Sequence, residues 1–359
     1  MRDLALQPGR VASAGVISQM SSSFSYVQAL RIARDSAVAL GFVADARRFN
    51  DVYTNVTMIF GERYWDASHN TYGNGQQAAL VYALYLGSVP VAREEAMLEQ
   101  LIELIQNATA QPSGEFHFPA NKTHQCDQTP CLDTGILSTK WMMELLSIKG
   151  RTDVGLDLVL TTAFPSWGFM AAMNSTTIWE HWELMNGEGM NSHNHAAFAS
   201  IGAWFFRWVV GVRLDDGADG SVVPNEHYGT GFKRVLFSPG CVTDARLPSV
   251  AARIHTSFGP VEMAWIKSAS EIVISLSLPA NTCGRVVIPA IAQPASTRVT
   301  VSDVSLGKSA PGLVVWSAGK FAPAAVKGVL NGSIVGPSIE FEIRSGRYHF
   351  CALISEAPE

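Results

Sequence analysis

The sequence predicts a mainly helical region followed by a region of short strands, and three observations support this prediction. Between residues 22 and 212, apolar residues recur at the spacing of one helix face. From about residue 230, short β-branched runs alternate with Gly, Pro and Ser. The polar, Gly-rich stretch Asp215–Gly220 separates the two patterns. We therefore predict a helical domain over residues 1–213, a linker over 214–229 and an antiparallel β-sandwich over 230–359.

About seven helices are expected in the first region. The first has an apolar face from Leu30 to Leu40 and is expected to end at Gly41, a favoured residue after a helix. The segment Ala78–Leu86 is apolar on all sides, which indicates a buried helix. The other helices are expected at residues 49–60, 94–106, 136–146, 154–160 and 196–212. Helices of this length joined by short loops predict a stack of helical hairpins.

Short strands are expected in the second region. The β-branched runs predict strands at residues 234–239, 261–265, 271–276 and 285–289. The segment Ile339–Ile343 alternates strictly between apolar and polar residues. A turn at Ser345-Gly346 and a further strand at Tyr348–Phe350 are expected to follow it.

Composition and charge exclude several classes of protein. The 359 residues are 47% hydrophobic and only 16% charged, which argues against intrinsic disorder. The net charge is −5 and the chain has no basic cluster, so neither nucleic acid nor an anionic membrane is an expected partner. The longest apolar run, Ala203–Val212, is interrupted by Arg207 and is too short to span a bilayer. The composition assigns no oligomeric state.

Tryptophan is unusually frequent and is concentrated in one part of the chain. Five of the nine Trp fall within 42 residues: Trp167, Trp179, Trp182, Trp204 and Trp208. Clustered aromatic rings with few charges suit a sugar-binding cleft, because the C–H faces of a pyranose pack on such rings. Trp is also a common core residue, so both interpretations stay open.

The cysteines and the glycan acceptor motifs bear on the compartment. Asn-x-Ser/Thr occurs five times, which favours a secreted, extracellular glycoprotein, although the first ten residues show no signal peptide. The acceptor residues are Asn55, Asn107, Asn121, Asn174 and Asn331. Two disulfides are conceivable, Cys126–Cys131 across a short loop and Cys283–Cys351 between neighbouring strands, and free buried thiols are an equal alternative.

One carboxylate, Glu180, stands out as a candidate catalytic group. It lies between Trp179 and Trp182, and a low-dielectric setting of this kind is expected to raise the pKa of the carboxyl and prepare it for general acid or base catalysis. Glycoside hydrolysis needs two such carboxylates. The nearby Glu183 and Glu188 lack this aromatic setting. A paired or capping loop carboxylate is the structural alternative for Glu180.

Other motifs give weaker indications. His193-x-His195, with His181 nearby, has a usable spacing for a metal, but no companion Cys pair or His-x-x-x-His is present, so neither a metal nor a cofactor is expected. Asp127 and Asp133 are interpreted as turn and helix-cap residues. The sequence contains no phosphate loop, dinucleotide fingerprint or esterase nucleophile elbow.

Four stretches, in order along the chain, carry a resemblance to a known family. They are Tyr72-Gly73-Asn74-Gly75-Gln76-Gln77, Thr134–Lys140, Pro165–Glu180 with its Thr-Thr-Ile-Trp-Glu end, and Met190-Asn191-Ser192-His193-Asn194-His195. With these stretches, the chain from about residue 20 to its end resembles the α-L-rhamnosidases of glycoside hydrolase family 78. Gly231-Phe232-Lys233 and Ser345–Tyr348 resemble the start and end of that family's C-terminal β-domain.

The resemblance implies both a fold and a reaction. The fold is an (α/α)6 barrel followed by a β-sandwich, and the reaction is the removal of terminal α-L-rhamnose from glycosides or polysaccharides with inversion. Glu180 matches the family's general base, and His195 matches a His that hydrogen-bonds rhamnose hydroxyls. Trp167 and Trp179 match aromatic positions that line or support the sugar pocket.

The chain also departs from the family pattern. The family's general acid lies in an upstream Gly-Trp-x-Gly-Asp segment that is not found here, and a full barrel needs twelve helices. We therefore expect a truncated chain that holds roughly half of the barrel and lacks the general acid. A non-catalytic or degenerate sugar-binding protein of the same fold is the alternative, and another (α/α)6 hydrolase or lyase is a further one.

Overall fold

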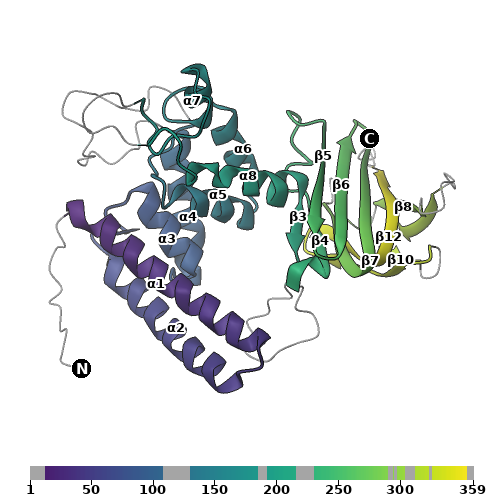
Figure 1. Cartoon of the computed structure of the whole chain (residues 1–359), viewed down its shortest axis with the longest axis horizontal. Helices are drawn as coiled ribbons and strands as arrows, with labels where there is room; N and C mark the ends of the chain where they lie inside the picture. The colour runs from purple at the N-terminus through teal and green to yellow at the C-terminus, as the bar shows by residue number, and fades with distance from the viewer. Residues whose placement is uncertain are drawn as a thin grey trace. The chain divides into compact units, whose positions relative to one another are not determined.

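The computed structural model describes residues 13–107, 130–184, 192–215, 230–289, 294, 297–303, 312–322 and 326–353. The chain divides into two compact units, Met1–Ser200 and Ile201–Glu359, which are described separately (Figure 1). The predicted linker over residues 214–229 falls almost wholly outside the described residues, so the predicted domain boundaries stay predictions.

The first unit is helical. Two long helices form an antiparallel pair, the short hairpin β1–β2 follows, and the remaining helices pack in sequence, with α3 against α4 and α5, and α5 against α6 (Figure 1). The elements are α1 (Ser13–Ala39), α2 (Val43–Tyr64), β1 (Trp65–Asp66), β2 (Thr71–Tyr72), α3 (Gln77–Leu86), α4 (Val91–Gln106), α5 (Thr139–Ile148), α6 (Thr152–Leu160), α7 (Trp167–Ala172) and the 3-10 turn η2 (Phe198–Ser200).

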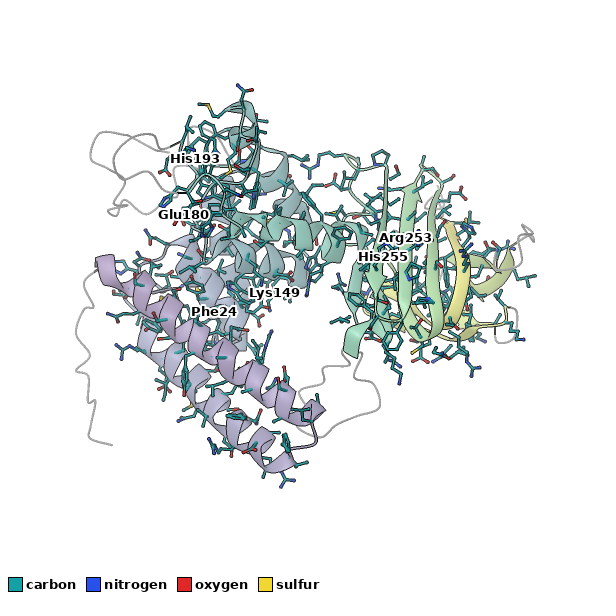
Figure 2. The ribbon with its side chains drawn as sticks, viewed as in Figure 1. Phe24, Lys149, Glu180, His193, Arg253 and His255 are labelled. Atoms are coloured by element: carbon teal, nitrogen blue, oxygen red, sulfur yellow. The ribbon has the colours of Figure 1, made fainter. Side chains whose placement is uncertain are left out.

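The predicted helices of this unit are confirmed, and the reason for their positions is visible in the packing. All residues of α3 except Tyr85 are buried, as its all-round apolar sequence predicts. Phe24 of α1 packs its ring 4.7 Å from Tyr82 of α3 and 5.2 Å from Trp141 of α5, measured between ring centroids (Figure 2). Helix α7 was not expected because six residues are too few to show a period. Its first turn is capped by Ser166, whose hydroxyl accepts the Phe169 N–H.

The second unit begins with a short helical segment. The single helix expected at residues 196–212 is instead divided into η2, the α-helical turn α8 (Ile201–Trp204) and the π-helix η3 (Phe205–Val210). The wider last turn is closed by a hydrogen bond from Gly211 N–H to the Phe206 carbonyl, five residues back. Gly211 has φ 93°, a left-handed conformation that ends the segment.

The rest of the second unit is β-structure. The strands are β3 (Val212–Leu214), β4 (Arg234–Phe237), β5 (Ser249–Thr256), β6 (Gly259–Lys267), β7 (Glu271–Pro289), β8 (Arg298–Asp303), β9 (Leu313–Ser317), β10 (Lys320–Phe321), β11 (Val329–Val335) and β12 (Ser338–Leu353). A 3-10 turn, η4 (Thr230–Phe232), precedes β4. The strands join in the order β10-β9-β8-β12-β7-β4-β3, with β11 added on β12 and the pair β5–β6 added on β7 (Figure 1).

Two long strands organise this sheet. Strands β7 and β12 pair with each other along their length, and each changes its other neighbour halfway. The first half of β7 pairs with β6 and its second half with β4, while β12 pairs first with β11 and then with β8. Side chains from both halves join one hydrophobic core, so the two long strands carry the chain from one part of the sheet to the other.

Three sequence predictions for this unit are wrong. The segments 271–276 and 285–289 are strand, as expected, but they are joined in the one strand β7 and are not separate strands. The expected turn at Ser345-Gly346 is a β-bulge within β12, where the register against β7 shifts between Arg344 and Gly346. The pairing of β4 with β7 is parallel, so the sheet is not wholly antiparallel.

Two buried interactions position the core of the second unit. The indole N–H of Trp265, a fully buried residue of β6, donates to the Val209 carbonyl at 2.9 Å and joins the π-helix to the sheet. The buried carboxylate of Asp215 pairs with Arg234 at 3.2 Å and with Arg285 at 3.0 Å. Each oxygen of the Asp215 carboxylate therefore accepts a hydrogen bond from one guanidinium group.

The cysteines differ partly from the prediction. Cys283 and Cys351 are free thiols, so the suggested bond between them is wrong. Cys131 is disulfide-bonded, and Cys126, its suggested partner, lies outside the described residues. Among the residues that the structure describes, no helix is both long and apolar enough to cross a membrane.

Replacing Gly211 by Ala is expected to destabilise the second unit by about 3 kcal/mol or more, because the φ of 93° is strained for Ala. In addition, the new Cβ would lie 2.4 Å from the Pro239 nitrogen. Urea unfolding measures the change in the free energy of unfolding between this variant and the parent chain.

Gly202→Ala is the matched control, since its Cβ would meet no atom within 4 Å in a helical turn. This variant is expected to be as stable as the parent chain or slightly more stable. Equal stability of the two variants would contradict the role assigned to Gly211.

Candidate active site

The candidate residues lie in loops of the first unit that follow α7. Residues 173–184 and 192–197 contain no regular helix or strand, yet hydrogen bonds pair them. The Ile178 carbonyl accepts the His195 N–H at 2.8 Å, and the Ser192 carbonyl accepts the Glu180 N–H at 2.9 Å. The Thr177 hydroxyl also donates to the His193 carbonyl. The two loop segments therefore run side by side, and Figure 2 labels Glu180 and His193 in this region.

Glu180 is held by its own backbone and by its side chain. The Ser192 N–H donates to Glu180 Oε2 at 2.9 Å, which complements the bond between the Glu180 N–H and the Ser192 carbonyl. The Glu180 side chain stays partly exposed. The neighbouring Trp179 and Trp182 are only 4% and 8% exposed. The two rings therefore point into the protein, while the carboxylate between them in sequence remains accessible to water.

His195 lies on the facing segment with a defined proton arrangement. Its Nδ1 accepts the Ala197 N–H at 3.2 Å. A neutral imidazole that accepts at Nδ1 carries its proton on Nε2, so the outer nitrogen of this ring is a hydrogen-bond donor. The His193 ring lies 5.5 Å from the Trp179 ring, tilted by 35°. The loop pairing thus brings a carboxylate and an N–H donor to two adjacent segments.

The tryptophans of the first unit form the support behind these loops. Trp182 stacks on Phe198 with ring centroids 3.8 Å apart and meets Trp167 edge-on at 5.2 Å. The Trp167 indole donates to the Phe198 carbonyl at 3.0 Å, and the Trp182 indole donates to the Thr134 carbonyl at 2.8 Å. Trp182 therefore connects the loop of Glu180 to the segment before α5.

Asp133, next to Thr134, lies in a setting that its interpretation as a helix-cap residue does not describe. Its backbone N–H donates to the Gln77 side chain at 2.9 Å, but both carboxylate oxygens are inaccessible and have no hydrogen-bond partner among the described residues. The helix-cap interpretation is therefore wrong for this residue. Burial raises the pKa of Asp133 to about 7. The sequence signal was an acidic residue directly after the apolar pair Cys131-Leu132.

Gln77 explains how this segment is fixed. Its buried side-chain amide donates to the Cys131 carbonyl at 2.9 Å and to the Leu104 carbonyl at 3.3 Å, while its oxygen accepts the Asp133 N–H. All three bonds are made to backbone atoms. One amide of α3 therefore holds the end of α4 and the segment that carries Asp133 and Thr134.

Other candidate residues are placed as follows. His181 Nδ1 and Glu183 Oε2 lie 4.0 Å apart. Asp127 and Glu188 lie outside the described residues. Within the described ranges, no three His, Cys, Asp or Glu side chains gather as a metal ion would require.

Comparisons with known proteins identify relatives of both units. Residues 15–116 and 120–209 match the family described as bacterial alpha-L-rhamnosidase 6 hairpin glycosidase domain, and residues 225–303 match the bacterial alpha-L-rhamnosidase C-terminal domain. An alpha-L-rhamnosidase of Alteromonas sp. (strain LOR) is 28% identical over 280 residues, which are 76% of this chain and 26% of the relative. One of Streptomyces avermitilis is 30% identical over 255 residues, 68% of this chain and 21% of the relative. The chain thus spans about a quarter of the length of these relatives.

Solved structures show the same fold. The alpha-L-rhamnosidase from Dictyoglumus thermophilum superposes with a TM-score of 0.73 at 25% identity, covering 97% of this chain and 33% of that one. The Streptomyces avermitilis enzyme, solved in complex with L-rhamnose, superposes with a TM-score of 0.65 at 24% identity, covering 92% and 26%.

Replacing Asp133 by Asn is expected to remove a pH dependence of stability. The folded carboxyl titrates at about 7 and an unfolded Asp at about 3.9, so between these values the folded state retains a proton that the unfolded state has released. The contribution of Asp133 to the free energy of unfolding is therefore fully present below pH 4 and falls by at most about 1.4 kcal/mol per pH unit up to pH 7. Urea unfolding of the two proteins between pH 4.5 and 8 measures this slope.

The matched control is Asp153→Asn. Burial raises the pKa of Asp153, but the hydrogen bonds and the charge of Arg151, together with backbone hydrogen bonds, lower it by a larger amount, so the net shift is downward. Its carboxylate is ionised throughout pH 5–8, and the control is expected to keep the parent slope. If Asp133→Asn kept the parent's pH dependence of the free energy of unfolding, the assignment of a buried, protonated Asp133 carboxyl would be refuted.

Proposed function

Because the chain belongs to the bacterial α-L-rhamnosidase family, we propose that this protein hydrolyses terminal α-L-rhamnose from rhamnose-containing glycosides or polysaccharides, with inversion of configuration. The observation that carries the proposal is the partly exposed Glu180 carboxylate, held at Oε2 by the Ser192 N–H. Glycosidases of the inverting type need such a carboxylate to activate water.

Glu180 is the proposed general base. In an inverting reaction the base takes a proton from a water that attacks the anomeric carbon from the side opposite the leaving oxygen. Within the described residues, Oε2 is the oxygen that has a backbone donor, so Oε1 is the one we assign to the water. The backbone bonds to Ser192 restrict the carboxylate to one orientation, and such positioning lowers the barrier to proton transfer.

His195 and the two aromatic residues are the proposed sugar-binding groups. The Nε2–H of His195 donates to a rhamnose hydroxyl, since Nδ1 is occupied by the Ala197 N–H. Trp167, partly exposed, lines the pocket. Trp179 is only 4% exposed, and its ring lies against the His193 ring. It is therefore proposed to support the sugar pocket through this contact.

The general acid is proposed to be a carboxyl group outside the described residues. Asp133 is protonated near neutral pH, as an acid should be, but its oxygens are inaccessible. A group that protonates a glycosidic oxygen must come within hydrogen-bond distance of it. Asp133 is therefore assigned to the support of the site and not to the reaction.

The same family membership supports two proposals about the rest of the molecule. Helices α1–α6 are proposed to be part of an (α/α)6 barrel, and the strands of the second unit to form a β-sandwich about the shared core. The protein is proposed to be extracellular and glycosylated. Support comes from the bonded Cys131 and from acceptor residues that are exposed in the described part of the chain, namely Asn55, Asn107, Asn174 and Asn331.

Glu180→Gln is expected to lower kcat on an aryl α-L-rhamnoside by about 10²–10⁴-fold in the intact natural protein, because the amide cannot accept the proton of the water. The glycosidase assay is accompanied by a circular dichroism spectrum, which is expected to be unchanged.

Glu183→Gln removes a carboxylate three residues away, whose side chain is 13% exposed, and is expected to keep turnover within a few-fold. Near-parental turnover by Glu180→Gln would exclude the general-base role. Rhamnose binding by the parent protein without any turnover would favour the non-catalytic sugar-binding protein.

His195→Ala is expected to raise KM for the same substrate by about 3–10-fold, the worth of one hydrogen bond to a neutral hydroxyl. His195→Gln restores an N–H donor on the side chain and is expected to recover part of the loss. Steady-state kinetics distinguish the two variants, and an unchanged KM in His195→Ala would exclude this contact.

A further inference from the structure

A buried hydrogen bond joins the loop of Glu180 to the segment that precedes α5. Trp182 follows Glu180 by two residues, and its indole N–H donates to the Thr134 carbonyl at 2.8 Å. Trp182 is 8% exposed and Thr134 is 1% exposed. A hydrogen bond in such surroundings is electrostatically stronger than in water, and an acceptor left there without a donor is costly. The bond therefore restricts where the loop of Glu180 lies.

The Thr134 carbonyl that accepts this bond belongs to a well-fixed segment. The Thr139 hydroxyl, at the start of α5, lies 2.9 Å from the Thr134 hydroxyl and donates to the Gly135 carbonyl at 2.8 Å. It also lies 3.2 Å from the Thr134 carbonyl, but a hydroxyl has a single proton to donate, and the Trp182 indole is the nearer of the two donors. On the other side of Thr134, the Gln77 amide bonds to the backbone. The loop of Glu180 is thus attached to a fixed acceptor.

The Trp182 ring also contacts the facing loop segment. It stacks on Phe198, with ring centroids 3.8 Å apart and an interplanar angle of 28°. Phe198 follows His195 by three residues and is 1% exposed. The stacking and the hydrogen bond are separable contributions of one side chain, since a phenyl ring can replace the first but not the second.

The chemistry proposed for Glu180 requires accurate placement of its carboxylate. A general base must lie within hydrogen-bond distance of the water from which it takes a proton. A misplacement of about 1 Å can lower a rate by about 100-fold, even when the change is remote from the reacting atoms. Trp182 and Glu180 share a loop that contains no helix or strand, so loss of the bond to Thr134 is expected to displace the carboxylate.

We propose that Trp182 is a positioning residue for Glu180, acting through the hydrogen bond from its indole N–H to the Thr134 carbonyl. This bond holds the Glu180 carboxylate where it can take the proton of the attacking water. Trp182 is buried and does not contact the sugar. The inference rests on the general-base role proposed for Glu180, and it adds a residue whose effect on turnover is transmitted only through that carboxylate.

Trp182→Phe in the intact natural protein tests the proposal, because phenyl keeps an aromatic ring against Phe198 and removes the indole N–H donor. We expect kcat on an aryl α-L-rhamnoside to fall by about 10- to 100-fold, as displacement of the base requires. KM is expected to change by less than about twofold, since the segment of His195 keeps its stacking partner. An unchanged kcat would overturn the proposal.

Trp265→Phe is the matched control, since it removes the same kind of bond from the second unit. The Trp265 indole donates to the Val209 carbonyl at 2.9 Å, and the Trp265 side chain is fully buried. Urea unfolding is expected to show a lower midpoint for both variants, because each leaves a buried carbonyl without its indole donor. Only Trp182→Phe is expected to lower kcat, and an equal loss of kcat in Trp265→Phe would refute a specific effect on Glu180.

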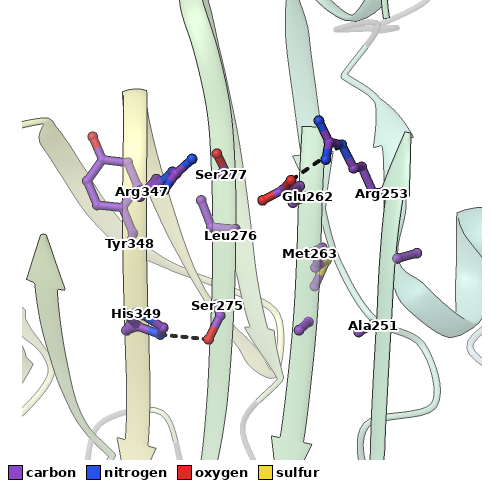
Figure 3. A pocket seen from close by; sticks show the side chains of 12 residues that line it. Ala251, Arg253, Glu262, Met263, Ser275, Leu276, Ser277, Arg347, Tyr348 and His349 are labelled. Atoms are coloured by element: carbon purple, nitrogen blue, oxygen red, sulfur yellow. Dashed lines mark hydrogen bonds and ion pairs between the residues drawn. The ribbon is translucent and has the colours of Figure 1, made fainter. Parts of the chain in front are cut away.

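An exposed control is also available in the second unit. A hollow of about 580 Å³ lies among side chains of β5, β6, β7 and β12 (Figure 3). Arg253 and Glu262, which line it, are paired at 3.4 Å, with side chains 55% and 41% exposed. An exposed pair of this kind contributes little to stability, so Arg253→Gln is expected to leave kcat and KM unchanged. A tenfold fall of kcat in this variant would count against the proposal, because turnover would then respond to changes outside the site.

The decisive comparison introduces Trp182→Phe into the Glu180→Gln protein. If the indole acts only through Glu180, the double variant is expected to turn over within about twofold of Glu180→Gln alone, because no base remains to be positioned. A merely structural role would cause the same loss in both backgrounds, and that result would overturn the positioning role while leaving the proposed function intact. Near-parental turnover by Glu180→Gln alone would instead exclude the general base, and with it the premise of the inference.

Discussion

The pairing of two loop segments, 177–180 with 192–195, is the constraint on which the candidate active site depends. Neither segment is helix or strand, so the positions of Glu180 and His195 rest on the few bonds between them. Of the four bonds described between them, two join backbone atoms only, and this part of the pairing does not depend on which side chain occupies each position. Two of the proposed site side chains also help to hold the loops: Glu180 Oε2 accepts the Ser192 N–H, and His195 Nδ1 accepts the Ala197 N–H.

The loop pairing in turn depends on aromatic rings behind it. Trp182 is fixed by stacking on Phe198 and by its bond to the Thr134 carbonyl, and Trp167 is bonded to the Phe198 carbonyl. The Trp-rich stretch that first indicated a sugar cleft is thus in large part a packing scaffold. The core-residue interpretation therefore applies to Trp179 and Trp182, and sugar binding at this stretch stays part of the proposed function.

The sequence predicted local features well and distant contacts poorly. Helices such as α3 and α4 follow from periodic apolar residues, which depend on neighbours three and four positions away. The bulge at Gly346 has the residues of a turn, and only its pairing with β7 shows that β12 continues. Asp133 was misinterpreted because its surroundings include residues distant in sequence, such as Gln77, which lies 56 residues earlier and accepts its backbone N–H. Glu180 and His195 were found through ordered motifs, whereas their pairing through Ile178 and Ser192 required the structure.

Asp133 and Glu180 carry the same chemical group in two different environments of the first unit. Glu180 is partly exposed and accepts a backbone N–H, so water can reach its carboxylate. Asp133 has lost its water without gaining a partner among the described residues, and burial therefore favours its protonated form. It is adjacent to Thr134, whose carbonyl anchors Trp182. The Asp133 carboxyl is thus buried in the segment whose carbonyl holds the ring behind Glu180, while the carboxylate proposed for catalysis stays accessible to water.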